Sequence, residues 1–235
     1  MTDSNDPVLK LTNVHRRFGN FVAVEDLSMT FAPGELTCII GPNGAGKSTV
    51  LNMICGTLPL TGGSITYGDT PINGCTPEDI AKLGIARKFQ VPSVFESLDV
   101  IENLRLAVKG TDENWISTLL ELIHLEDDRH VLAADLPHGK KQWLEIGMAL
   151  AMRPKVLLLD EPTAGLSVDE TSDMARFLKG LDGSVTVIVI EHDMAFVREL
   201  GARTIVLNHG SILASGPFDV VEHDETVRDV YLGRH

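Results

Sequence analysis

The feature that most constrains the fold is a glycine-rich segment at residues 41–49, which lies between two stretches of different character. Residues 36–40 before it are almost wholly apolar, as in a strand that is covered on both faces, and residues 47–55 favour a helix. The segment fits the pattern G-x-x-x-x-G-K-[ST] and consists of Gly41, Pro42, Asn43, Gly44, Ala45, Gly46, Lys47, Ser48 and Thr49. The order of strand, loop and helix predicts an α/β fold with a phosphate-binding loop.

This loop suits the phosphates of ATP together with Mg²⁺. Glycines let successive backbone N–H groups point at phosphate oxygens, and the helix that begins near Lys47 adds the positive end of its dipole. We expect Lys47 to neutralise the β- and γ-phosphates, Ser48 to ligate Mg²⁺ and Thr49 to lie on the α-phosphate side. The alternative is a glycine-rich turn without a ligand, which the strand and helix around the loop disfavour.

Two carboxylates follow a second apolar strand at residues 156–159. Asp160 suits the Mg²⁺ shell, whereas Glu161 suits the attacking water, because a carboxylate beside a metal-nucleotide can orient that water and accept its proton. The alternative is that Asp160 caps the next helix and Glu161 is a solvated charge. His192 follows a third apolar strand in the same way, so we expect it at the same edge of the sheet as a γ-phosphate contact.

The pattern along the chain predicts one domain over residues 1–235. Short β-like runs come first and indicate an N-terminal antiparallel β segment. Residues 91–152 have helical periodicity and are interpreted as an inserted helical subdomain. Strands and helices then alternate, which predicts a mainly parallel sheet with its sites at the carboxyl ends of the strands.

Composition limits the partners and the compartment. The chain has 20 Lys and Arg against 33 Asp and Glu, a formal net charge of -13, which argues against binding to nucleic acid. No apolar run has the roughly 18 residues that a membrane helix needs, and the polar, acidic N-terminus does not resemble an export signal. Cys38, Cys55 and Cys75 lack metal-like spacing and favour two buried thiols and one loop thiol in a reducing cytosol.

These residues, in this order, resemble the ATP-binding subunit of ABC transporters, a class of P-loop NTPase, over essentially the whole chain. Residues 41–49 match the Walker A loop, residues 156–161 the Walker B strand, residues 165–169 the D-loop and His192 the switch histidine. Gln90 matches the Q-loop glutamine. The resemblance implies that Glu161 is the general base and that Gln90 senses Mg²⁺ and the attacking water and relays to the membrane subunit. Phe18 stands at the position of an adenine-stacking aromatic, and a core phenylalanine is the equal alternative.

The resemblance also implies partners. Two such subunits pair head to tail as a homodimer or heterodimer, so that each ATP lies between the Walker loop of one and the signature helix of the other. The groove formed by the helical insertion receives integral membrane permease subunits, and an extracytoplasmic solute-binding protein acts indirectly through them. The chain is therefore expected to be cytoplasmic and peripheral on the inner face of the cell membrane.

The signature segment departs from the family pattern L-S-G-G-Q. It consists of Leu136, Pro137, His138, Gly139 and Lys140. Proline in place of serine lacks a hydroxyl and a backbone N–H that could meet the γ-phosphate of the partner's ATP, although proline fits the first turn of a helix. Lys140 adds a cation near the same helix end. We expect this signature to serve its ATP site weakly.

Within the family, the chain is most similar to the branched-chain amino acid and urea uptake group. Residues 87–90 and 142–148 lean toward the urea-type subunit. The expected function is ATP hydrolysis that drives the uptake of urea, a short amide or a branched-chain amino acid. The alternative is a soluble ABC-type ATPase that acts on nucleic acid or ribosomes, which the charge of -13 and the lack of a long coiled coil disfavour. A kinase or GTPase would leave Gln90, the signature and His192 unexplained together.

The proline of the signature gives a direct test. Changing Pro137→Ser restores a hydroxyl and an N–H near a negative charge, and hydrogen bonds to charged groups contribute about 1.5–3 kcal/mol each. We expect steady-state ATPase activity of the assembled complex to rise on the order of tenfold. Unchanged activity would show that Pro137 does not weaken the site.

Overall fold

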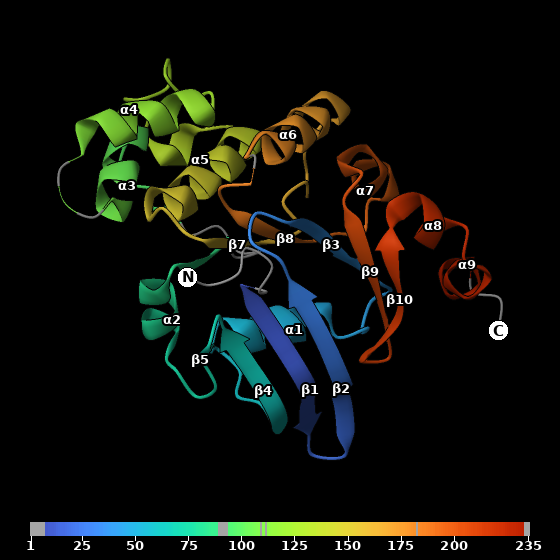
Figure 1. Cartoon of the computed structure of the whole chain (residues 1–235). Coiled ribbons are helices and arrows are strands. Elements are labelled where there is room, and N and C mark those ends of the chain that lie inside the picture. Colours follow the sequence, from blue (N-terminus) through green and yellow to red (C-terminus); the bar gives the residue numbers. More distant parts are fainter. Residues whose placement is uncertain (1–7, 89–93, 109, 111, 182, 233–235) are drawn as a thin grey trace.

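The computed structural model describes residues 8–88, 94–108, 110, 112–181 and 183–232, which form two sheets with helices around and between them (Figure 1). The strands are β1 (Leu9–Phe18), β2 (Phe21–Phe31), β3 (Leu36–Ile40), β4 (Gly62–Tyr67), β5 (Thr70–Pro71), β6 (Ile85–Lys88), β7 (Val156–Asp160), β8 (Thr186–Ile190), β9 (Arg203–Asn208) and β10 (Ser211–Pro217). The helices are α1 (Lys47–Ile54), α2 (Pro77–Leu83), α3 (Val100–Ala107), α4 (Glu113–Leu122), α5 (His138–Ala151), α6 (Val168–Gly180), α7 (Met194–Leu200), α8 (Phe218–Glu222) and α9 (Glu225–Leu232).

The larger sheet is mainly parallel, as predicted. Among the described residues its strands follow the order β10-β9-β3-β8-β7-β6, and only the β9–β10 pair is antiparallel. The carboxyl ends of β3, β7 and β8 therefore meet at one edge of the sheet. The phosphate loop follows β3, Asp160 ends β7 and His192 comes two residues after the end of β8.

The apolar strands of this sheet are buried on both faces because two separate cores cover them. Side chains alternate along each strand. In β7, Leu157 and Leu159 belong to the core formed with α3 to α7, whereas Val156 and Leu158 belong to the core formed with α1 and the antiparallel sheet. This arrangement explains why residues 36–40, 156–160 and 186–190 show no polar alternation.

The smaller sheet has the order β2-β1-β4-β5 and forms the antiparallel segment predicted near the N-terminus. Its strands are longer than the apolar pattern indicated. The ladder between β1 and β2 continues to the pair Phe18 and Phe21, although residues 15–18 are largely polar. The registers shift near Asn13, which has a positive φ of 45°. Backbone pairing across a tight turn, rather than burial of side chains, therefore sets the length of these strands.

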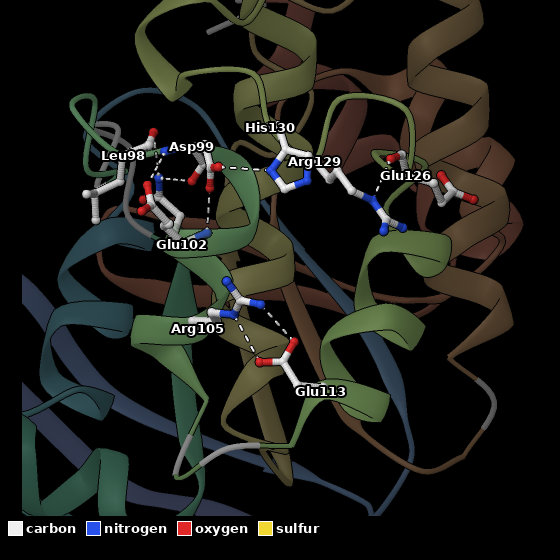
Figure 2. Close-up of polar contacts among 9 residues, drawn as sticks. Leu98, Asp99, Glu102, Arg105, Glu113, Glu126, Arg129 and His130 are labelled. Carbon is white, nitrogen blue, oxygen red and sulfur yellow. Dashed lines mark hydrogen bonds and ion pairs between the residues drawn. The ribbon is translucent and has the colours of Figure 1, made fainter.

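Helices α3, α4 and α5 pack against one another and are called here the helical unit; they lie at the upper left of Figure 1. Asp99 and Glu102 form a capping box at the start of α3, since Asp99 accepts from the backbone of Glu102 and Glu102 from that of Asp99. The His130 Nδ1 lies 3.2 Å from Asp99 Oδ2, and Arg105 of α3 donates to Glu113 of α4 (Figure 2). The boundary of residues 91–152 as a subdomain stays a prediction.

A further prediction concerns the burial of the three cysteines. Cys38 and Cys55 are buried and Cys75 is half-buried in a loop, as expected. Burial raises the pKa of Cys38 to about 12 and that of Cys55 to about 11, so both thiols stay protonated at neutral pH. None of the helices in the described ranges is long and apolar enough to cross a membrane.

Candidate active site

The phosphate loop wraps around the side chain of Lys47. The Lys47 Nζ donates to the backbone oxygens of Gly41 at 2.6 Å and Pro42 at 3.1 Å, and the side chain is largely buried. Gly46 lies before α1 with a φ of 100°, and a Cβ there would lie 2.7 Å from the oxygen of Ala23. Ser48 and Thr49 lie in the first turn of α1, with Ser48 exposed. The predicted loop, strand and helix are thus in the expected order.

A turn far along the sequence supports this loop. The backbone N–H of Gly210, between β9 and β10, donates to the oxygen of Ala45 at 3.0 Å. The oxygen of Gly210 accepts from Glu25 at 3.0 Å, so the same turn also holds β2. Sequence reasoning missed this contact. The adjacent residues His209 and Gly210 indicated a turn, but no local pattern shows which segment a turn contacts.

The charges of two carboxylates act on Lys47. Burial lowers the pKa of Lys47, whereas the negative charges of Glu161 and Asp160 raise it. The ammonium group therefore lies near the carboxyl ends of β3 and β7 at the same time. These contributions agree with the strand order, which brings the carboxyl ends of β3 and β7 to the same edge of the sheet.

Asp160 is the last residue of β7 and is held by an arginine that sequence reasoning gave no role. Arg87 Nη2 lies 2.9 Å from Asp160 Oδ2, with both side chains almost completely buried. Arg87 Nη1 also donates to Asn52 Oδ1 of α1 at 2.6 Å. The alternative that Asp160 caps a helix does not hold, because the cap of α6 is Ser167.

The residues present fit Mg²⁺ bound together with a nucleotide. Ser48 and Asp160 supply hydroxyl and carboxylate oxygens, which are hard ligands of the kind that Mg²⁺ prefers. Across the described ranges there is no group of three or more His, Cys, Asp or Glu side chains that could hold a metal ion. A donor set of two protein oxygens suits a metal ion that takes its other ligands from phosphates and water.

Glu161 and His192 form the second part of the site. Glu161 adopts a positive φ of 48°, and its Oε1 lies 3.4 Å from His192 Nδ1. The His192 side chain is 63% exposed. The structure therefore brings together two residues that lie thirty-one positions apart in sequence, both at the edge where the strands end.

Glu191 is a buried residue that fixes this pair, and the sequence analysis assigned it no role. Its side chain is completely buried and accepts from the backbone N–H of Thr163 at 3.1 Å and from its hydroxyl at 2.6 Å. It also accepts from the N–H of His192 at 3.1 Å. A carboxylate so held joins the loop after β7 to the loop after β8. The signal was a glutamate directly after the four apolar residues 187–190.

Two predicted residues stay untested by the geometry. Phe18 ends β1 and is 46% exposed, and the Arg16 guanidinium carbon lies 4.4 Å from its ring centroid. This exposure does not fit the alternative of a core phenylalanine, and stacking on adenine stays a prediction. Gln90 lies outside the described residues.

The signature residues lie at the start of α5 and contact their own chain. Leu136 is buried, whereas Pro137 and His138 are exposed. The His138 Nε2 lies 2.9 Å from the oxygen of Ala164, and Lys140 Nζ lies 2.5 Å from Asp128 Oδ2.

Two details differ from the expectation for this segment. Pro137 is the N-cap of α5 rather than a residue of its first turn, and it supplies no side-chain cap. The charge of Lys140 is balanced by Asp128 within the chain. A Cβ on Gly139 would lie 2.3 Å from Glu170 Oε1, so this glycine admits a carboxylate from α6.

Comparison with known proteins gives the family. Residues 24–164 match the ABC transporter family. The chain is 32% identical to the high-affinity branched-chain amino acid transport ATP-binding protein LivG of Escherichia coli strain K12, covering 97% of this chain and 99% of that protein. It is also 32% identical to the lipopolysaccharide export system ATP-binding protein LptB of the same strain, over 96% of this chain and 97% of that one.

A solved structure agrees with the fold. The chain superimposes on the ADP conformation of MJ1267, an ATP-binding cassette of an ABC transporter, with a TM-score of 0.87 and 29% identity, covering 97% of this chain and 99% of that chain. The protein therefore belongs to the ATP-binding subunits of ABC transporters, and it is an ATPase of the P-loop fold.

The glycines of the loop give a matched pair of variants. Gly46→Ala adds a Cβ 2.7 Å from the Ala23 oxygen at a φ of 100°, so strain of about 1–3 kcal/mol falls on the loop. We expect ATP affinity, measured by titration calorimetry, to fall by about tenfold or more. Gly44 also has a positive φ, 81°, but a Cβ added there meets nothing within 4 Å. We therefore expect Gly44→Ala to lower the ATP affinity clearly less than Gly46→Ala does. Equal losses in the two variants would contradict this account.

Proposed function

We propose that the protein is the ATP-hydrolysing subunit of an importer for a small polar solute, either urea or a short amide or a branched-chain amino acid. The observation that carries the hydrolytic part is the contact of Glu161 with His192, beside the buried Lys47 ammonium and the phosphate loop. LivG, by its name, serves branched-chain amino acid transport, which supports uptake, whereas LptB belongs to an export system. Residues 87–90 and 142–148 favour the urea-type branch.

The geometry supports a division of roles among the site residues. Lys47 and the backbone N–H groups of the loop bind the phosphates. In this proposal Glu161 orients the attacking water and accepts its proton, and His192, whose Nδ1 lies 3.4 Å from Glu161 Oε1, contacts the γ-phosphate. Ser48 and Asp160 would hold Mg²⁺, which supplies positive charge at the β- and γ-phosphates when bound. Gln90, outside the described residues, completes this set as a proposal.

A second ATPase subunit is needed to complete each site. Pro137, His138 and Val168 are exposed, and Val168, at the start of α6, has 83% of its surface open. An apolar side chain this exposed beside the signature suits a surface that another subunit covers. We propose that two subunits pair so that the α5 signature of one closes the ATP site of the other.

In this proposal the permease docks at a cavity beside β6, the edge strand of the larger sheet. A cavity of about 340 Å³ lies between α2 and α5, with β6 at its base and a mainly apolar lining that includes Ile80, Ala81, Met148 and Ala149. A groove of this kind suits a short helix from a membrane subunit. The protein would then be cytoplasmic, held at the inner face of the membrane by the permease and linked through it to a solute-binding protein.

The role of Glu161 predicts a separation of binding from turnover. Glu161→Gln keeps the shape of the side chain but removes the proton acceptor, so we expect ATP affinity to stay and steady-state turnover of the assembled complex to fall about 10²–10⁴-fold. Titration with ATP measures the affinity, and the release of phosphate measures the turnover. Glu121→Gln, on the exposed side of α4, is the control and should leave both unchanged. Normal turnover in Glu161→Gln would remove Glu161 as the base.

The transporter assignment is tested by recovery of partners from native membranes. We expect the tagged protein to recover an integral membrane protein, and Ala149→Glu to reduce that recovery about tenfold or more, because a carboxylate would be placed in an apolar groove. Asn114→Glu, exposed in the first turn of α4, is the control for added charge. Recovery of ribosomes or nucleic acid without any membrane protein would sink the transporter proposal.

A further inference from the structure

Strand β6 carries two consecutive basic residues, Arg87 and Lys88, whose side chains lie on opposite faces of the sheet. The apolar residues before them show the alternation, because Ile85 belongs to the core that contains α1 and Ala86 to the core that contains α5. Continuing this alternation, Arg87 faces α1 and Lys88 faces α5. The contacts of both residues agree with it.

On the first face, Arg87 binds the carboxylate proposed to ligate Mg²⁺. The register places Arg87 opposite Leu158 of β7, so Asp160 is two positions further along the same face. The Nη2 atom meets Asp160 Oδ2 at 2.9 Å, and Nη1 meets Asn52 Oδ1 at 2.6 Å. The arginine thus joins β7 to the helix that follows the phosphate loop.

On the second face, Lys88 binds the helix that carries the signature. Its Nζ lies 3.3 Å from Glu145 Oε2, and the two side chains are 1% and 3% exposed. Glu145 lies in the middle of α5, about two turns after His138. Separating the two partners of a buried ion pair is costly, because each leaves an uncompensated buried charge. We therefore expect β6 and α5 to move together so that the pair stays intact.

The position of β6 in the sheet allows such a shift. Within the described residues β6 ends the sheet and hydrogen-bonds to β7 alone. An edge strand can change its angle without breaking a second ladder of hydrogen bonds. The short strand β6 therefore connects two buried ion pairs and can move with them. By contrast, β3, β7 and β8 each have a hydrogen-bonded strand on both sides.

We infer that Arg87 and Lys88 are positioning residues that couple the metal-ligating carboxylate of Asp160 to the signature helix α5 of the same chain, through one buried ion pair on each face of β6. The inference rests on the proposed role of Asp160. Metal binding at Asp160 changes the charge that Arg87 faces, and β6 passes the resulting displacement to Glu145. The partner's ATP site then meets a signature helix whose position depends on the metal in this chain's own site.

The test compares ADP in EDTA with ADP in Mg²⁺ on the full chain, at a concentration where light scattering gives a monomer. The readout is amide hydrogen exchange at residues 138–142, the first turn of α5. We expect Mg²⁺ to change this exchange beyond the effect of ADP alone. In Lys88→Met/Glu145→Met, which leaves neither charge of the pair buried, the Mg²⁺-specific change should disappear while the affinity for Mg-ADP stays within about twofold.

The exposed pair Arg105 and Glu113 of the helical unit, drawn in Figure 2, provides the matched control. Arg105→Met/Glu113→Met removes the same charges from α3 and α4 and should keep the full response. Persistence of the response in Lys88→Met/Glu145→Met would overturn the inference, as would its absence in the wild-type protein that binds Mg-ADP. Failure of the wild-type protein to bind ADP at all would instead refute the proposed function.

Three single variants keep the test decisive where the double variant does not fold. Glu145→Gln preserves side-chain shape and should reduce the Mg²⁺-specific exchange change by about half or more. Arg87→Met should lower the affinity of the ADP complex for Mg²⁺ by about tenfold, as loss of a residue behind a metal ligand commonly does, and Arg87→Lys should restore part of it. Unaltered Mg²⁺ affinity in Arg87→Met would overturn the part of the inference that concerns Asp160.

Discussion

The buried ammonium group of Lys47 is the constraint on which the site depends. It is held by two backbone oxygens of its own loop and lies within the influence of Asp160 and Glu161. A buried cation needs polar or negatively charged groups around it, and here the loop's own oxygens and the two carboxylates provide them. The loop and the end of β7 are therefore arranged around one positive charge, which suits the binding of phosphate oxygens.

The carboxylates of the site are in turn positioned by buried partners. Asp160 is bound by Arg87, and the loop that carries Glu161 is tied through Thr163 to the completely buried Glu191. Each of these partners comes from a neighbouring strand of the same sheet. The site is thus a property of the order of β6, β7 and β8, and a change in any one strand reaches the others through charged contacts rather than through packing alone.

Much of this could be predicted from the sequence because the informative patterns are local. The phosphate loop between a strand and a helix and the apolar strands expected at residues 36–40 and 156–159 each lie within a few residues, and all are confirmed. The strands β4, β5 and β6, the helices α2, α8 and α9 and the full length of β1 and β2 were not predicted. Their hydrogen bonds depend on distant partners, and their sequences are short or polar.

The support of Ala45 by Gly210 has a consequence for how the protein is made. The loop at residues 41–49 follows β3, which lies between β8 and β9, and a backbone N–H about 165 residues further along the chain binds the loop directly. During synthesis the N-terminal quarter of the chain emerges with the whole phosphate motif but with neither neighbouring strand. Residues 41–49 therefore gain the support of Gly210 only after the turn between β9 and β10 has been synthesised, and a nucleotide that binds this loop would stabilise that distant turn as well.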